Sequence, residues 1–137
     1  VPFVISMFTI VLSLDYVGAT RFIADFLSDI GSVFSFGFIS VAVANIINNI
    51  PMSVLFSSVL GNVSLTGNEY LKAVFSCVAG SNIGAYLTPV GALAGIMWSS
   101  ILKLYGIKLS FKEFIKNGIV IAVPTLLAAL VGIEIIL

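Results

Sequence analysis

Residues 31–61 have the sequence GSVFSFGFISVAVANIINNIPMSVLFSSVLG, which contains no charged side chain. Asn48, Asn49 and Pro51 interrupt this apolar stretch near its middle. A split there gives two arms of about 16 and 11 residues, whereas a bilayer core of about 30 Å needs about 20 helical residues. The pattern therefore predicts a re-entrant helical hairpin whose tip lies near mid-membrane, where irregular backbone must be buried in protein or line a wet cavity.

The composition of the whole chain is that of a protein in lipid. Hydrophobic residues make up 60% of the 137 positions and charged residues only 9%, whereas soluble domains are about a quarter charged. Six basic and six acidic residues cannot coat a soluble globule of this size. These figures predict a multi-pass, all-α integral membrane protein whose first partner is the lipid bilayer.

Missing residue types argue against several functions. The sequence contains no histidine and one cysteine, Cys77, which lies in an apolar run and offers neither zinc-ligand spacing nor a disulfide framework. Without histidine, paired carboxylates or a serine–base pair, an intramembrane enzyme is disfavoured. The net charge is zero and no basic tract is present, so we expect no nucleic-acid partner. We expect no resident cofactor or metal either.

Three further segments flank the hairpin and complete the predicted topology. Residues 1–17 predict a transmembrane helix that is shorter than a full span of about 20 residues, which suggests that it is clipped from a longer polypeptide. Residues 18–30 are amphipathic and predict a helix along the membrane interface. Residues 117–137 predict a transmembrane helix with a kink at Pro124. The apolar face of the interfacial helix carries Phe22, Ile23, Phe26, Leu27 and Ile30.

Residues 69–105 contain a second interruption of an apolar segment. A helix from about Glu69 to Ala79 leads into it, and a second helix follows over about residues 90–104. Glycine and proline together are strong breaks within a hydrophobic segment, so this stretch predicts a discontinuous transmembrane helix. The breaking residues are Gly80, Gly84, Pro89 and Gly91.

The two interruptions together predict a ligand site. Pro51 and Pro89 each follow a break, and Thr88 is a suitable N-cap, so each break predicts a new helix N-terminus with free amides and about half a unit of positive charge. Such ends bind anions, while unwound carbonyls and asparagine side chains suit a cation or a hydroxylated neutral solute. The candidate binding residues are Asn48, Asn49, Pro51, Gly80, Ser81, Asn82, Gly84, Thr88, Pro89 and Gly91.

Four lysines determine the predicted orientation. They lie between two predicted spans, in a loop over residues 103–116. By the positive-inside rule this loop is cytoplasmic in a cell (inner) membrane, so the C-terminus lies outside and the hairpin enters from the outer side. The four residues are Lys103, Lys108, Lys112 and Lys116.

These motifs resemble those of a known family. Asn48-Asn49-Ile50-Pro51 is similar to the N-N-x-P signature of the arsenical pump membrane protein family. Residues 80–118, GSNIGAYLTPVGALAGIMWSSILKLYGIKLSFKEFIKNG, look like that family's G-x-N-x-G-x-x-L-T-P-I-G-S-L-A-x-L-x-W block and the lysine-bearing loop after it. The resemblance covers nearly all of the chain and corresponds to about the last third of such a permease. Ala92 stands where the family commonly has serine, and Ala85-Tyr86 replace a proline-centred pair.

The resemblance implies one half of an inverted-repeat transporter. Each repeat would hold a hairpin and a broken helix in a moving transport domain, so the N-terminal repeat of the same transporter is a missing partner. Family members often form homodimers, and arsenite members export the trihydroxy species in exchange for protons, sometimes with a soluble ATPase subunit.

The departures from the family pattern leave several solutes open. The first expectation is efflux of arsenite, antimonite or a related small inorganic or organic anion, coupled to a proton or sodium ion. The second is a sodium/proton antiporter or a di- or tricarboxylate transporter of the same superfamily. A third hypothesis, from another class, is a non-transporting membrane subunit whose polar residues only pack helices.

Overall fold

The computed structural model describes residues 2–137, apart from the side chains of residues 3, 4 and 7. Val1, which the predicted first helix includes, lies outside the described residues. The described chain contains seven helices and no strand, which confirms the all-α class. The helices are α1 (Pro2–Tyr16), α2 (Ala19–Ile30), α3 (Val33–Ile47), α4 (Asn49–Asn62), α5 (Gly67–Gly84), α6 (Leu93–Leu104) and α7 (Phe111–Ile136).

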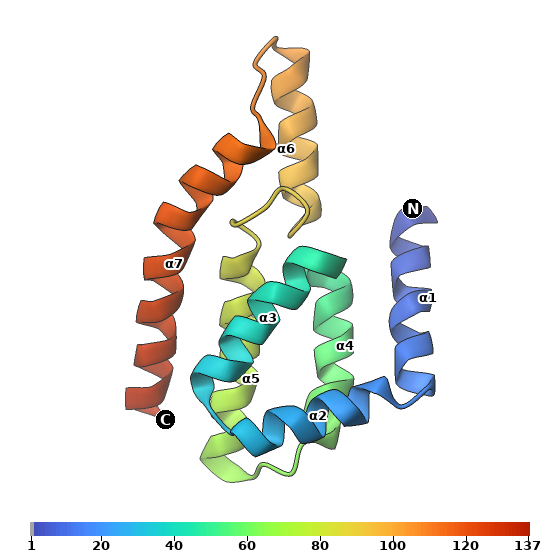
Figure 1. Cartoon of the computed structure of the whole chain (residues 1–137), viewed down its shortest axis with the longest axis vertical. Helices are drawn as coiled ribbons and strands as arrows, with labels where there is room; N and C mark the ends of the chain where they lie inside the picture. Colours follow the sequence, from blue (N-terminus) through green and yellow to red (C-terminus); the bar gives the residue numbers. More distant parts are fainter. Residues whose placement is uncertain (1) are drawn as a thin grey trace.

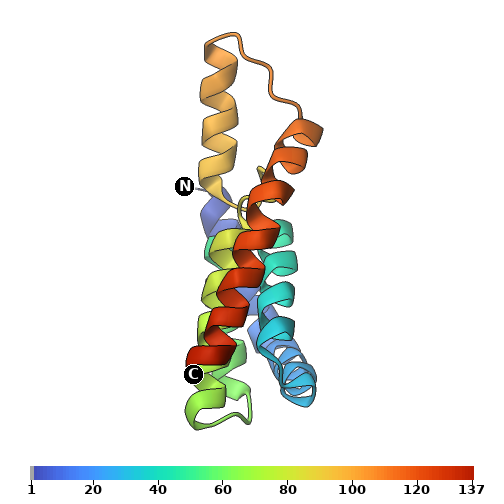
Figure 2. The same cartoon turned by 90° about the vertical axis from the view of Figure 1, so that its left-hand side faces the viewer.

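The helices form an elongated bundle with one projecting end (Figures 1 and 2). α3 and α4 run antiparallel beside α5, α7 packs along α5, and α1 stands beside α4. α2 lies across the lower end of the bundle in Figure 1, and α6 projects beyond its upper end. Only α7 among the described helices is long and apolar enough to cross a membrane unaided.

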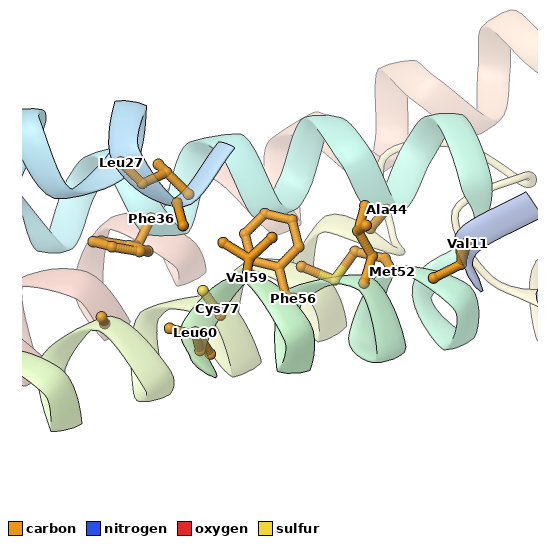
Figure 3. Close-up of a cluster of buried hydrophobic side chains, with 12 residues drawn as sticks. Val11, Leu27, Phe36, Ala44, Met52, Phe56, Val59, Leu60 and Cys77 are labelled. Atoms are coloured by element: carbon orange, nitrogen blue, oxygen red, sulfur yellow. The ribbon is translucent and has the colours of Figure 1, made fainter. Parts of the chain in front are cut away.

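Aromatic and aliphatic side chains from α2, α3 and α4 fill the main core (Figure 3). Phe36, Phe56 and Leu27 are no more than 2% exposed. Each such side chain contributes roughly 1.5–3 kcal/mol when it is removed from water. A second cluster joins α3 to α7 through Val33, Val41, Leu126 and Leu130.

Small residues allow α3 and α5 to approach closely. A Cβ on Gly80 would collide with the Gly37 backbone oxygen of α3, and one on Gly84 would lie 2.9 Å from Val41 Cα. Close contact through small side chains is a general way for helices to associate in lipid. Here it places the end of α5 directly against the upper half of the hairpin.

Polar contacts tie the helices together at the lower end. Lys72 Nζ lies 3.1 Å from Glu134 Oε1 and so links α5 to α7. Asp15, at the end of α1, accepts hydrogen bonds from Thr20 and from Ser58 of α4. These pairs occupy the end of the bundle opposite the lysine-bearing turn.

Three predicted boundaries are wrong. α5 continues past Ala79 to Gly84, because the glycines pack against α3 instead of breaking the helix. α6 begins at Leu93 and not near residue 90. α7 begins at Phe111, inside the predicted loop, because the side chain of Ser110 and that of Glu113 form a reciprocal capping box.

The predicted apolar face of α2 is only partly buried against the bundle. The residues that it buries against the protein are Thr20, Ala24 and Leu27. Phe22 and Phe26 are 76% and 52% exposed, so these aromatic side chains point away from the bundle. The position of α2 along the membrane interface stays a prediction.

Candidate functional site

The hairpin turns at a single residue, Asn48. Its backbone has φ 77° and ψ 151°, and it is the one described non-glycine residue with positive φ. Its side-chain oxygen accepts a hydrogen bond from the Ile50 amide at 3.3 Å and so caps α4. Asparagine suits the capping task, because it ranks among the best N-caps, whereas ψ 151° places Asn48 outside the left-handed helical region, in a conformation that is strained for residues other than glycine.

The hairpin turn is hydrogen-bonded to the segment between α5 and α6. Asn48 Nδ2 donates to the Val90 carbonyl at 3.0 Å, and the Asn49 amide donates to the Gly91 carbonyl at 3.0 Å. Asn48 is only 1% exposed, whereas Val90 is 41% exposed, so the bond between them is partly buried. The two interruptions of the sequence therefore meet in space.

Asn45 forms a second connection, one helical turn before the tip. Its Nδ2 donates to the Gly84 carbonyl at 2.8 Å, at the buried end of α5, where the Leu87 amide is a second donor at 3.0 Å. Its Oδ1 accepts a hydrogen bond from Thr88 Oγ1 at 2.7 Å, and Thr88 Oγ1 in turn accepts one from the Gly91 amide at 3.2 Å. We call Asn45, Asn48, Asn49, Thr88 and Gly91 the junction network.

Glycines let the surrounding backbone close on this network. A Cβ on Gly91 would lie 2.9 Å from Asn45 Oδ1, and one on Gly95 would lie 2.8 Å from the Pro89 carbonyl oxygen. A Cβ on Gly118 of α7 would collide with the Tyr86 carbonyl oxygen. The irregular segment is thus held between the hairpin, α6 and α7.

The predicted roles of Thr88 and the two prolines need correction. Thr88 does not cap α6, because Ala92 occupies that position and provides no side-chain hydrogen bond. Pro89 precedes α6 instead of opening it. Pro51 is the third residue of α4, still within the first turn, where a missing amide costs no helical hydrogen bond.

The predicted site residues on α5 separate into three positions. Gly80 and Gly84 face α3 in the helix contact described above. Ser81 lines a cavity of about 220 Å³ between α4 and α5, together with Ser53. Asn82 lines a different cavity, on the side of the junction network.

This second cavity has a volume of about 440 Å³ and is the strongest candidate for a solute site. Asn49 lines it at the start of α4, Asn82 lines it in the last turn of α5, and Ala92 lines it at the N-terminus of α6. Trp98 and Phe114 form an aromatic wall, with their ring centroids 6.0 Å apart. None of the described residues that line the cavity is charged.

The cavity presents neutral hydrogen-bonding groups. Asn82 Nδ2 already donates to the Val78 carbonyl at 2.8 Å, which leaves its oxygen as an acceptor. The Asn49 side chain has no hydrogen-bond partner among the described residues, so it offers both a donor and an acceptor. The first amides of α6 are not capped by a side chain. A small hydroxylated solute matches this set of groups.

Sequence reasoning missed Asn45, Trp98, Phe114 and Gly118 as parts of this region. Asn45 could have been identified from the sequence, since it precedes Asn48 by three residues and therefore lies about one helical turn before the hairpin tip. Trp98 and Phe114 meet between α6 and α7, and Gly118 meets Tyr86 of the α5–α6 segment, contacts that no local pattern reveals.

The comparisons with known proteins agree with the resemblance. A family model described as "Arsenical pump membrane protein" matches residues 1–137. An Escherichia coli protein named "Arsenical pump membrane protein" is 26% identical over 139 residues, which cover 97% of this chain and 32% of the relative. A Bacillus subtilis protein named "Putative arsenical pump membrane protein" is 27% identical, with 93% and 30% covered.

A Synechocystis protein named as an uncharacterized transporter is 29% identical over 152 residues, which cover 93% of this chain and 34% of the relative. No solved structure matches the chain. The chain thus spans about a third of the length of the curated relatives it matches. Since the family model covers the chain from end to end, this chain belongs to the arsenical pump membrane protein family.

Proposed function

We propose that this chain forms the C-terminal part of a secondary permease that exports arsenite, antimonite or a related anion. The observation that carries the proposal is the cavity beside the junction network, which Asn49 lines from the start of α4 and Asn82 from the last turn of α5. The names of the matched relatives favour an arsenical solute over sodium/proton exchange or carboxylate transport. They also favour a transporter over an enzyme.

The polarity of the cavity suits the trihydroxy form of arsenite, the species that the resemblance implies. An amide side chain can accept from one hydroxyl group and donate to another. With no charge in its described lining, the cavity has no fixed counter-ion for a bare anion. A neutral solute needs none, because its hydroxyl groups require only matched hydrogen bonds.

The proposed membrane arrangement follows from the helix lengths. α3 and α4 have 15 and 14 residues, short of the roughly 20 that span a bilayer. We place their junction near mid-membrane as the tip of a re-entrant hairpin, with α5 and α6 as the two parts of a discontinuous helix. The lysine-bearing turn then lies in the cytoplasm and the C-terminus outside.

The other half of the site is proposed to come from the rest of the polypeptide. Curated relatives are about three times as long as this chain, which covers 32% of one of them. An N-terminal repeat of opposite topology would close the open side of the cavity. Alternating access would then expose the solute to each face in turn, driven by a proton or sodium gradient. Homodimer formation and a soluble ATPase partner remain proposals from the resemblance.

Transport measurements on the complete polypeptide test this function. Everted membrane vesicles carrying Asn49→Ala or Asn82→Ala should lose arsenite uptake while the protein stays inserted in the membrane. Asn62→Ala is the matched control, because Asn62 lies at the far end of α4 and its amide bonds only the Ser58 carbonyl. Full uptake by both cavity variants, or loss of uptake in the control as well, would contradict the assignment.

A solute panel in the same vesicles tests the chemistry of the cargo. Arsenite and antimonite should be taken up and should compete with one another. Uptake of sodium or a dicarboxylate, without uptake of arsenite, would contradict the proposed substrate and favour the second expectation.

A further inference from the structure

The end of the molecule formed by α6 and the turn into α7 is both apolar and basic. We call residues 103–116 the basic tip. Figures 1 and 2 show it projecting beyond the other helices. Gly106, with φ 74°, reverses the chain here. The side chains of Lys103, Lys108, Lys112 and Lys116 all lie within it.

The apolar side chains of the basic tip have no cover within the described chain. Leu104 is 84% exposed and Tyr105 is 79% exposed, while Ile107 and Phe111 are each more than half exposed. α6, which leads into the tip, contains no buried residue among those described. Large exposed apolar side chains gathered at one end indicate contact with a partner or a membrane.

The charges of the basic tip are not balanced from within. Among the described residues, the ion pairs are those of Lys72 with Glu134 and Glu69, so none involves a lysine of the tip. The single carboxylate of the tip, Glu113, is engaged by the Ser110 amide and hydroxyl at 2.9 and 2.7 Å. The tip therefore has a net charge of +3, four lysines less Glu113, and all four lysines are exposed.

We infer that the basic tip is a docking surface for anionic lipid headgroups. Lysines attract phosphate groups at a negative surface, while Tyr105 and Phe111 suit the boundary between headgroups and acyl chains. Long lysine side chains can lie along apolar neighbours and still reach the headgroups. An acidic protein would pair with the lysines of the tip but would not match its exposed apolar side chains. Lipid would also match the exposed apolar side chains of the tip, Leu104, Tyr105, Ile107 and Phe111.

This surface lies away from the proposed solute cavity and does not depend on which solute is carried. Attraction to an anionic surface weakens as salt rises, since the Debye length falls from about 10 Å at 0.1 M to about 3 Å at 1 M. Each lysine near such a surface strengthens binding by roughly fivefold. The tip should therefore respond to lipid charge in a graded, salt-sensitive way.

The test follows the position of the tip in nanodiscs. The complete polypeptide, with its other reactive cysteines removed, carries an environment-sensitive fluorophore on Ile107→Cys. Quenching by acrylamide, which is neutral, is compared in phosphatidylcholine nanodiscs with and without phosphatidylglycerol. We expect the anionic lipid to reduce quenching roughly twofold at low salt, and this protection should be lost near 1 M salt.

Charge variants separate the docking surface from a general effect of lipid. Replacing all four tip lysines with glutamine should abolish the protection, and Lys108→Gln alone should weaken it. Arg21→Gln is the matched single-charge control on α2, the helix that lies across the opposite end of the bundle, and should leave the protection unchanged. Equal quenching in both lipids, or protection that survives the fourfold substitution, overturns the inference. Protection that appears only with an added acidic protein assigns the surface to that partner instead.

Discussion

The junction of α3, α4 and α5 and the projecting α6 are built in opposite ways. At the junction, backbone and asparagine side chains share hydrogen bonds, and glycines bring α3 and α5 into direct contact. α6 has no buried residue, and its described aromatic contact is the edge of Trp98 against Phe114. The junction is thus defined by the chain itself, whereas α6 depends on lipid or on further polypeptide for its surroundings.

This contrast explains how irregular backbone is tolerated in an apolar protein. Unpaired amides and carbonyls cost several kcal/mol each in lipid, so every interruption needs partners close by. Asn45 and Asn48 provide them from the hairpin to Gly84 and Val90. The first turn of α6 lacks a side-chain cap and faces the cavity, where a solute can supply the missing partner.

Among substitutions at the junction, the largest effect should come from breaking the α3–α5 contact. Gly80→Ala places a Cβ against the Gly37 backbone oxygen and 2.8 Å from Ser40 Cβ. Because backbone cannot move aside cheaply, we expect a loss of about 3 kcal/mol in the free energy of unfolding. Denaturation in mixed micelles followed by circular dichroism measures it.

Gly132→Ala is the matched control for that substitution. Gly132 also lies within a helix, but a Cβ there would meet nothing within 4 Å. Replacing a helical glycine in open space should stabilise the protein by roughly 0.5–1 kcal/mol. Equal effects of the two substitutions would refute the close packing of α3 on α5.

A smaller effect is expected from the bridge between Asn45 and Thr88. Asn45→Ala removes one of the two donors to the Gly84 carbonyl, which keeps the Leu87 amide, and leaves the Thr88 hydroxyl without its acceptor, which should cost about 2 kcal/mol. Thr88→Val should cost less, and the two changes combined should show about 1 kcal/mol of coupling. Thr88→Ser keeps the hydroxyl and should restore stability. Strict additivity of the two substitutions would show that the side chains do not interact.

Substitution of Asn48, the turn residue, should lower the free energy of unfolding by an amount that depends on the replacement. Asn48→Ala loses the cap of α4 and also forces alanine to adopt φ 77°. Asn48→Gly loses the same side-chain bonds but accepts positive φ without strain. We expect alanine to be less stable than glycine by about 1 kcal/mol, measured by the same unfolding assay. The reverse order would mean that the hairpin does not turn at this residue.

The smallest effect is expected on α6. Met97 is 64% exposed, so Met97→Ala should change the free energy of unfolding in detergent by less than about 0.5 kcal/mol. Phe36→Ala is the contrasting variant in the core and should cost about 3–5 kcal/mol. A similar loss at both positions would show that α6 packs within the bundle.

Most of the helices and their order could be predicted from the sequence, because apolar runs and polar interruptions are local signals. The turn at Asn48 follows from two asparagines and a proline in a stretch without charge. The end of α5 was misplaced because glycine marks both helix breaks and close helix contacts, and only the position of α3 distinguishes them. The start of α7 could have been found, since Ser110 and Glu113 have capping-box spacing.

Less of the candidate site than of the fold could be predicted from the sequence. The sequence indicated which residues are polar, but the sharing of hydrogen bonds depends on contacts across more than forty positions, such as that of Asn45 with Thr88. Asn48 is enclosed by its partners, whereas the neighbouring Asn49 side chain faces the cavity. No local pattern separates two adjacent asparagines in this way.

The most direct test of the account is a cross-link between the two interruptions in native membranes. Ile50 and Val90 flank the bonds between Asn48, Asn49 and the α5–α6 segment, and both are exposed enough to label. With a short bifunctional thiol reagent, Ile50→Cys should cross-link to Val90→Cys but not to Tyr105→Cys. Failure of the first pair, with both cysteines labelled singly, would mean that the hairpin tip and the broken helix lie apart.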